Sequence, residues 1–379
     1  MKDSEPYDVA IIGGGLAGLS LSIQLAKAGY RVAVFEKEKY PFSKVCGEYV
    51  SFESWNFLEE LGVPLSDWNL PIIKRLQVSS PDGNLLEQHL ALGGFGISRY
   101  KLDATLADIA RSSNVCLFEQ TKITEVKFEK SLFSVNSSDT HFTARVVCGT
   151  FGKRSNLDIK WKRNFILQKK SRLNNYIGVK YHIKTDLPSD LIGLHNFSNG
   201  YCGISQIEDN KYCLCYLSAA INLKLSHNSI QAMETNILQR NPFLHSIFNS
   251  SSFLTNQPVT ISHISFDKKS QVEDHVLMIG DAAGMITPLC GNGMSMALHG
   301  SKIAFECIHQ FLEKKIERHE MEQQYKDRWN RQFSKRILAG RILQRFFGSE
   351  RLSNLLIGSL KPFPAIIKGL IRLTHGQPF

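Results

Sequence analysis

The pattern of apolar and polar positions predicts alternating strands and helices at the start of the chain. Residues 9–12 form an unbroken apolar run, which is typical of a parallel strand buried on both faces. Leu16, Leu19 and Ile23 then recur at helical spacing, a glycine ends that helix, and residues 31–35 are the next expected strand. The order strand, helix, strand predicts a βαβ unit with a parallel sheet.

Further along, the pattern changes to paired strands and then to helices. Residues 73–92 read as a hairpin that turns at Pro81-Asp82-Gly83, and residues 200–219 as a second that turns at Asp209-Asn210. Beyond residue 335, apolar stripes at helical spacing alternate with single Arg or Lys residues. We therefore expect an α/β fold of two domains, with a doubly wound parallel sheet, an antiparallel sheet and C-terminal helices.

The first turn carries the spacing G-x-G-x-x-G, formed by Gly13, Gly15 and Gly18. Gly13 permits a tight turn, Gly15 lets the backbone approach a pyrophosphate, and Gly18 lets helix and strand pack closely. The N–H groups and the dipole at the helix start favour an anion. Glu36 ends the second strand, at the distance where an acid meets a ribose hydroxyl. This unit predicts a dinucleotide site.

A second glycine-bearing loop follows a buried strand late in the chain. Residues 276–279 are apolar and lead into Gly280-Asp281, and the stretch 288–293 then enters a helix from about Met294. An aspartate at a strand end can accept hydrogen bonds from ribose or ribityl hydroxyls. A loop that enters a helix N-terminus presents N–H groups and positive potential, which suit the negative charge of a reduced flavin ring.

Together, the two glycine loops resemble the FAD-binding framework of the hydroxybenzoate-hydroxylase-like flavoproteins. The stretch 96–110 resembles the Arg-x-x-Leu-x-x-x-Leu helix of that family. The resemblance implies FAD as the cofactor, with Asp281 facing its ribityl-pyrophosphate region and residues 291–294 beside its isoalloxazine. The residues implied to bind the cofactor are Gly13, Gly15, Leu16, Ala17, Gly18, Glu36, Lys37, Lys44, Arg99, Val126, Gly280, Asp281, Gly291, Gly293 and Met294.

One segment departs from the family pattern. Residues 146–155 align with the family's Gly-Ala-Asp-Gly-x-x-Ser, whose aspartate takes part in cofactor and NAD(P)H handling, and this chain has Phe151 in that place. An aromatic ring cannot accept the hydrogen bonds of a carboxylate. The electron donor, NAD(P)H or another reductant, therefore stays open.

The segment 39–62 resembles the stretch after the first βαβ unit of geranylgeranyl reductases. Its layout is K-Y-P, then K-x-C-G-x-x-x-S, then L-x-x-L-G, and Glu48 stands where the reductases have a glycine. Glu48 is the sharper catalytic candidate, because a carboxylate can bind substrate or move a proton. Cys46 is the second, as a thiolate beside the flavin or as a small residue that lets the loop approach the ring.

The resemblance implies an FAD-dependent oxidoreductase that acts on a hydrophobic substrate, isoprenoid, lipid-like or polyketide-like. The alternative within the superfamily is a monooxygenase or halogenase that uses NAD(P)H-reduced flavin and O2. The tryptophan-halogenase signature Trp-x-Trp does not occur in the sequence. A different class, an escort protein that binds prenyl groups without flavin, shares a related fold and stays as a second hypothesis.

The chain carries more basic than acidic residues, and its composition bears on the expected partners and compartment. The formal net charge is +10, with basic excess at 153–184 and beyond 335. This suits either a solvated face or peripheral contact with an anionic membrane through the C-terminal region, and nothing resembles a nucleic-acid motif. Eight cysteines without C-x-x-C predict neither a metal site nor a disulfide framework. Without a signal-peptide pattern, we expect a cytoplasmic protein.

These motifs predict a discontinuous domain organisation. Residues 1–72, 97–160 and 270–312 are expected to form the FAD-binding domain. Residues 73–96 and 161–269 are expected to form the substrate-binding sheet, and residues 313–379 a basic helical region.

Overall fold

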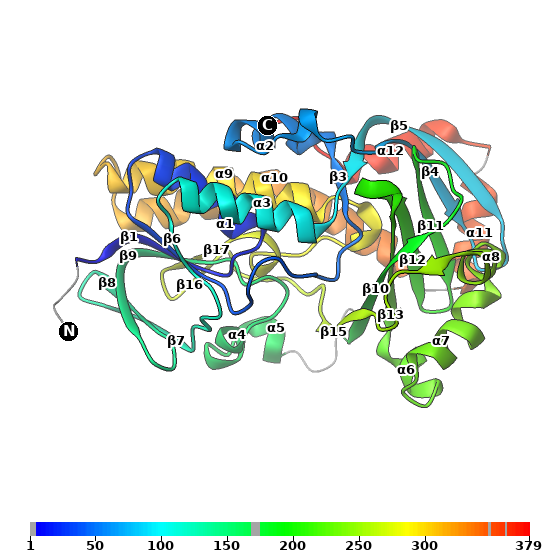
Figure 1. Cartoon of the computed structure of the whole chain (residues 1–379), viewed down its shortest axis with the longest axis horizontal. Helices are drawn as coiled ribbons and strands as arrows, with labels where there is room; N and C mark the ends of the chain where they lie inside the picture. The colour runs from blue at the N-terminus through cyan, green and yellow to red at the C-terminus, as the bar shows by residue number, and fades with distance from the viewer. Residues whose placement is uncertain (1–4, 168–174, 348–349, 361) are drawn as a thin grey trace.

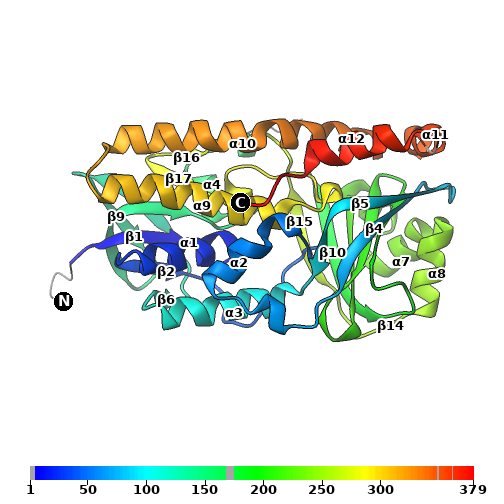
Figure 2. The ribbon, with the colours of Figure 1, turned by 90° about the horizontal axis from the view of Figure 1, so that it is seen from above.

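The structure is a computed structural model that describes residues 5–167, 175–347, 350–360 and 362–379, and parts of the expected substrate and C-terminal segments lie outside these ranges. Two sheets lie side by side, and long helices run across both (Figures 1 and 2). The predicted fold class, a doubly wound α/β unit joined to a second sheet, is confirmed.

The first sheet, which we call sheet A, contains the predicted βαβ unit. Its strands β1, β2, β6, β9 and β17 are parallel, in the order β17-β9-β1-β2-β6. Because β1 has β2 on one side and β9 on the other, the strand order reverses beside β1, and such a switch point opens a crevice at the strands' carboxyl ends. The strands are β1 (Tyr7–Ile12), β2 (Val32–Phe35), β6 (Cys116–Phe118), β7 (Glu125–Glu129), β8 (Leu132–Asn136), β9 (His141–Gly149), β16 (Val272–Glu273) and β17 (Val276–Met278).

The second sheet, sheet B, has the order β14-β10-β13-β12-β11-β4-β5-β3, and β15 pairs with β10. Both predicted hairpins are present, with Asp209 and Asn210 at positive φ (60° and 54°) in the second turn. The expectation of an antiparallel sheet needs one correction, since β4 and β11 pair in parallel. The strands are β3 (Tyr49–Ser51), β4 (Ile72–Ser79), β5 (Leu85–Gly96), β10 (Tyr176–Lys184), β11 (Leu191–Phe197), β12 (Gly200–Gln206), β13 (Tyr212–Ala219), β14 (Ser252–Phe253) and β15 (Val259–Ile264).

Helices cover both sheets and leave one face of sheet B toward the crevice. Helices α1 (Leu16–Lys27), α3 (Arg99–Ser112) and α9 (Gly293–Leu312) pack with sheet A in one apolar core. Met233 of α7 and Leu244 of α8 pack against the other face of sheet B. The shorter helices are α2 (Trp55–Leu61), α4 (Asn156–Lys160), α5 (Asn164–Leu167), α6 (Ala220–Leu225), α7 (Ile230–Asn236) and α8 (Pro242–Ser250).

The C-terminal region joins the two halves. Helix α10 (Arg318–Phe347) runs along α9, and α11 (Glu350–Leu360) and α12 (Pro364–Thr374) lie over β4 and β5 (Figure 2). Ile357 and Ile367 pack against Val78 and Leu86. Among the described residues, every helix is too short or too polar to cross a membrane.

Candidate active site

A deep cleft lies between the carboxyl ends of the sheet A strands and the front face of sheet B, which is the face opposite α7 and α8. It encloses about 1240 Å³, more than the ~300–1,000 Å³ of a typical single-ligand pocket. The cleft therefore has room for a dinucleotide and a second molecule. Most predicted site residues line it: Gly13, Gly15, Leu16, Ala17, Glu36, Lys37, Lys44, Cys46, Glu48, Arg99, Gly280, Asp281, Gly291, Gly293 and Met294.

Two of the predicted residues are not among those that line the cleft. Gly18 lies behind it, where a Cβ would stand 2.1 Å from the Gly13 carbonyl oxygen, so its role is close packing of helix and strand. Val126 is buried in β7, paired with Val135, and the structure does not bring it to the cleft. The preceding loop, residues 121–123, lines the cleft instead, and the sequence patterns did not indicate it.

The first glycine loop has little room for side chains. Gly13 has φ +110°, and a Cβ there would stand 2.7 Å from the Thr150 backbone. The Gly14 N–H donates to Glu36 Oε2 (2.9 Å), and the Glu38 N–H donates to Glu36 Oε1 (3.1 Å). A carboxylate offers about four acceptor sites, so Glu36 can still accept a ribose hydroxyl. The loop geometry fits the ADP half of FAD.

Cations face the N-terminus of α1. No side chain caps this helix, and its first turn holds no acidic residue, so its free N–H groups are open to a ligand. A Cβ on Gly15 would stand 3.6 Å from both Arg99 Nη2 and Lys44 Nζ. Backbone donors, the helix dipole and two cations thus converge on one space, which suits a pyrophosphate.

Asp103 holds these two cations in place. Its carboxylate is buried and accepts from Arg99 Nε (2.8 Å) and Nη2 (2.7 Å), and Lys44 Nζ lies 3.1 Å away. Burial alone would raise the pKa of Asp103, but the charges of Arg99 and Lys44 lower it. Asp103 is therefore ionised at neutral pH and orients both cations. Sequence reasoning missed it, although it lies four residues after Arg99 on the same helix face.

The second glycine loop presents another uncapped helix start. Helix α9 has no side-chain cap and no acid in its first turn, and Gly291 takes φ +63° with the Tyr49 ring beside it. Lys269 Nζ donates to the Asp281 carbonyl oxygen (2.8 Å), which fixes the backbone before the loop. Burial lowers the pKa of Lys269 to about 8. These features fit the ribityl and ring end of FAD.

The backbone carbonyl groups of the loop 44–48 are held by side chains from both halves of the fold. Lys180 Nζ donates to the Lys44 oxygen (3.2 Å), and Lys153 Nζ lies 3.4 Å from the Val45 oxygen. The Cys213 thiol donates to the Cys46 oxygen (3.2 Å). The loop therefore bridges the two sheets, and its position is set by strands far away in the sequence.

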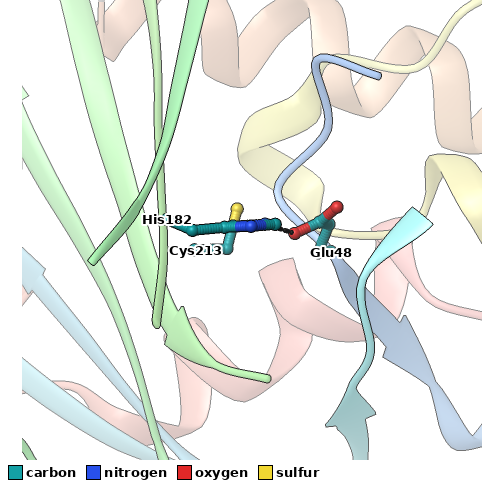
Figure 3. Close-up of side chains that lie close together, drawn as sticks. All are labelled: Glu48, His182 and Cys213. Carbon is teal, nitrogen blue, oxygen red and sulfur yellow. Dashed lines mark hydrogen bonds and ion pairs between the residues drawn. The ribbon is translucent and has the colours of Figure 1, made fainter. Parts of the chain in front are cut away.

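Glu48 is the centre of this attachment (Figure 3). Its Oε1 accepts from Lys180 Nζ (2.5 Å) and from the Arg99 N–H (2.8 Å). Its Oε2 lies 2.6 Å from His182 Nε2, the contact that Figure 3 shows. Glu48 is fully buried and has φ +56°, which is costly for a non-glycine residue. Burial would raise its pKa, but the His182 hydrogen bond and the Lys180 charge lower it. Glu48 is thus an ionised anchor.

Glu48, His182 and Cys213 are metal-ligand types with ligand atoms within 4.8 Å of one another. Glu48 already accepts a hydrogen bond from the ammonium group of Lys180. Burial raises the pKa of the Cys213 thiol well above that of a free thiol. We therefore interpret the group as an ion-paired cluster of protein side chains.

The rest of the cleft is lined mainly by apolar side chains and extends under the C-terminal helices. Side chains from β4, β5, β11 and β15 form its walls, and α12 closes it. The residues of this part include Leu76, Val78, Leu86, Leu90, Leu194, Ile261, Ile264, Leu343, Ile357, Ile367, Leu370 and Ile371. The sequence stripes indicated helices at 366–371 but gave no sign that they close a cavity. Phe151 also lines the cleft, with its ring packed against Gly149.

Comparison with known proteins defines the class. Residues 8–45 match the family model described as FAD dependent oxidoreductase. The matched segment carries the first glycine loop, so the chain is similar to FAD-dependent oxidoreductases where that loop predicted it, and the glycine cradles and cations of the cleft fit FAD.

Relatives with known names cover most of the chain. Conditioned medium factor receptor 1 of Dictyostelium discoideum is 27% identical, covering 91% of this chain and 72% of the relative. Digeranylgeranylglycerophospholipid reductase of Methanococcus vannielii is 21% identical, over 88% and 85%. Kynurenine 3-monooxygenase of Flavobacterium psychrophilum is 22% identical, over 80% and 72%. The resemblance to reductases and monooxygenases of this superfamily is thereby confirmed.

Solved structures share the fold over nearly the whole chain. The flavin-dependent brominase Bmp2 has a TM-score of 0.78 and 19% identity, covering 97% of this chain and 93% of that one. A geranylgeranyl bacteriochlorophyll reductase-like protein from Thermoplasma acidophilum has a TM-score of 0.78 and 19% identity, over 97% and 95%. At this identity the likeness concerns the fold alone.

Proposed function

We propose that this protein is an FAD-dependent reductase of an elongated hydrophobic substrate. The observation that carries the proposal is the apolar compartment that continues the FAD cleft under α12. A pocket lined by aliphatic side chains binds aliphatic chains through burial of apolar surface. The relative from Methanococcus vannielii, whose name is that of a reductase of geranylgeranyl chains, is consistent with this choice.

The residues then divide into three roles. FAD, when bound and reduced, supplies two electrons to the substrate. Gly13, Gly15 and Glu36 hold its ADP half, Arg99 and Lys44 neutralise its pyrophosphate, and the 291–294 loop supports its ring. The aliphatic wall orients the substrate chain and excludes water. We keep the predicted domain division, with 1–72, 97–160 and 270–312 as the FAD-binding part, within this proposal.

Glu48 and Cys46 contribute to this reaction through where they lie: Glu48 fixes the loop that faces the flavin, and Cys46 lies next to it in the cleft. Because Glu48 is buried and ionised, with Lys180, His182 and the Arg99 N–H as donors, we assign it the role of fixing the loop that faces the flavin. Cys46 lines the cleft beside it, close to the flavin region. Burial alone would lower the pKa of Arg99, but Asp103 and, more weakly, Cys46 raise it, so Arg99 stays cationic.

The experiment is anaerobic turnover. The FAD-loaded protein is reduced photochemically under nitrogen and mixed with detergent-solubilised geranylgeraniol, and flavin absorbance and product mass are followed. The proposal predicts flavin oxidation with a mass gain of two hydrogens in the absence of O2. Flavin that stays reduced until O2 is admitted, followed by an oxygenated product, would contradict it.

The second candidate is a monooxygenase or halogenase. It is favoured by the 22% identity to kynurenine 3-monooxygenase and by the fold shared with a brominase. The same experiment separates the two, because an oxygenase requires O2 for every turnover. The electron donor, NAD(P)H or another reductant, is a separate question, and Phe151 argues against NAD(P)H contact at its loop.

We further propose peripheral contact with an anionic membrane through α12. On this helix Ile366 and Leu373 are 51% and 57% exposed, and Lys368 and Arg372 are exposed beside them. An apolar and cationic outer face above a lipid-like substrate cavity suits a bilayer surface. Flotation with phosphatidylglycerol vesicles should recover the wild type but not a Lys368→Glu/Arg372→Glu variant, whereas Lys314→Glu should float normally. Equal flotation of all three would exclude this contact.

A further inference from the structure

Three residues that line the cleft carry a buried hydroxyl group without a hydrogen-bond partner within the described protein: Tyr49, Tyr201 and Ser205. Tyr201 packs with Met285 and Leu289, whereas Tyr49 and Ser205, whose side chains are 5% and 1% exposed, lie next to the residues that surround Glu48. Leaving a buried hydroxyl unpaired costs about 1–3 kcal/mol. Buried polar groups in folded proteins nearly always have a partner, so each of these groups requires an explanation.

Chain neighbours and strand pairing connect both Tyr49 and Ser205 to the cluster around Glu48. Tyr49 follows Glu48 in the chain, and its cross-strand partner is Gly96. Gly96 in turn lies close to β12, because a Cβ added to it would stand 1.8 Å from the Gln206 carbonyl oxygen. Ser205, the neighbour of Gln206, pairs with Cys213, whose thiol donates to the Cys46 oxygen. Both hydroxyls therefore belong to the part of the cleft where sheets A and B meet, next to the loop that faces the flavin.

The surroundings of the two hydroxyls leave room for a ligand. Ser205 shares the front face of sheet B with Gly203 and Cys215, which are small and line the cleft. The Tyr49 ring packs against Gly291, where a Cβ would stand 3.2 Å from it. The ring is thus fixed by packing, while its hydroxyl is left without a protein acceptor. Burial raises the pKa of Tyr49, which keeps this hydroxyl protonated and able to donate.

We propose that Tyr49 and Ser205 bind an oxygen atom of the substrate, so that the site takes an apolar chain that carries a hydroxyl or carbonyl group. This inference rests on the proposed function, because it places the substrate in the apolar compartment. The aliphatic wall binds the chain, and the two hydroxyls fix the oxygen-bearing end beside the flavin. The two residues determine specificity, since an analogue without the oxygen leaves both hydroxyls unpaired.

The test compares farnesol with farnesene, a hydrocarbon of the same skeleton, as ligands of the FAD-loaded protein. Binding is measured from the perturbation of the flavin absorption spectrum. We expect wild type to bind farnesol about tenfold or more tightly than farnesene, which corresponds to about 1.4 kcal/mol. Tyr49→Phe and Ser205→Ala should each weaken farnesol binding about tenfold, whereas farnesene binding should stay the same or become tighter, because one unpaired hydroxyl has been removed.

Tyr212→Phe is the matched control, because the Tyr212 hydroxyl donates to the Leu187 carbonyl oxygen away from the cleft. It should leave both affinities unchanged and lower the melting temperature. Tyr49→Phe and Ser205→Ala should leave the ligand-free melting temperature and the FAD affinity as in wild type.

Three results would overturn this inference without contradicting the proposed function. They are equal affinity of wild type for farnesol and farnesene, a lowered FAD affinity in Tyr49→Phe or Ser205→Ala, and a lowered ligand-free melting temperature in those variants. The second result would assign the hydroxyls to the cofactor, and the third to the protein interior. Failure of both farnesol and farnesene to bind wild type would contradict the proposed function itself.

Discussion

Substitution of Glu48 by glutamine tests whether this residue anchors the loop. The glutamine keeps the size of the side chain and one acceptor oxygen but removes the charge. Lys180, whose side chain is 2% exposed, would then be a buried cation without its counter-charge. Breaking a buried ion pair from one side costs about 3–5 kcal/mol. Because one acceptor remains, we expect the lower end, about 3 kcal/mol.

This loss translates into a measurable melting shift. An unfolding entropy of about 2.1 cal/mol/K per residue gives roughly 0.8 kcal/mol/K for a chain of 379 residues. Glu48→Gln should therefore lower Tm of the FAD-loaded protein by about 4 °C. The folded pKa of Glu48 is lowered, so its contribution is complete above about pH 4.3 and is lost as the pH falls through the folded pKa.

Calorimetry at neutral pH is the assay, and two variants make it specific. Glu125→Gln is the same substitution at an exposed ion pair with Lys127, and it should shift Tm by less than about 1 °C. In Glu48→Gln/Lys180→Met the buried cation is removed as well, so the loss should be smaller than the sum of the single losses. An unchanged Tm for Glu48→Gln, or additive losses in the double variant, would refute the anchoring role.

Three further outcomes follow from the site. Gly15→Val should give a folded protein that purifies without flavin absorbance, because the new side chain would fill the space faced by Arg99 and Lys44. Burial lowers the pKa of Lys269 to about 8 in the folded protein, whereas a lysine in the unfolded chain has a pKa of about 10.4. Between these two pH values the unfolded chain binds more protons than the folded one. The contribution of Lys269 to the free energy of unfolding should therefore rise by about 3 kcal/mol from the lower pH to the upper. Because other groups titrate in the same window, the test is the difference between proteins: in urea unfolding, the stability of wild type relative to Lys269→Met should rise by about 3 kcal/mol from the lower to the upper end of the window. Cys46→Ser should keep FAD content and turnover near wild type, and a large loss of turnover alone would show that the thiol takes part in the chemistry.

The nucleotide-binding half of the site was predictable because its determinants are local. Gly13 takes φ +110° in the turn after β1, Gly18 is required by a backbone contact with Gly13 in the same βαβ unit, and Glu36 follows from the strand length. Arg99 could be placed because it begins a helix with a recognisable spacing. Val126 could not, since whether a strand residue or the loop before it reaches the cleft depends on the register of β7 and β8.

The substrate half of the site depends on contacts between distant segments. Lys180 and His182 alternate along β10 with no local signal, and their importance appears only once β10 faces the loop that carries Glu48. Likewise, the amphipathic pattern of α12 predicts a helix with one buried face but not the surface that it covers. Ile367 and Ile371 close the cleft because α12 lies over β5, which is a matter of tertiary packing.

The central claim is that the substrate occupies the apolar compartment under α12 while FAD occupies the cleft. The most direct test is the Ile371→Trp variant, which places a larger side chain in that compartment, compared with Leu132→Trp at an exposed position of β8 as control. We predict that both variants carry FAD and react with O2 like wild type, and that only Ile371→Trp loses anaerobic flavin oxidation by geranylgeraniol. Undiminished oxidation by geranylgeraniol in Ile371→Trp would contradict the claim.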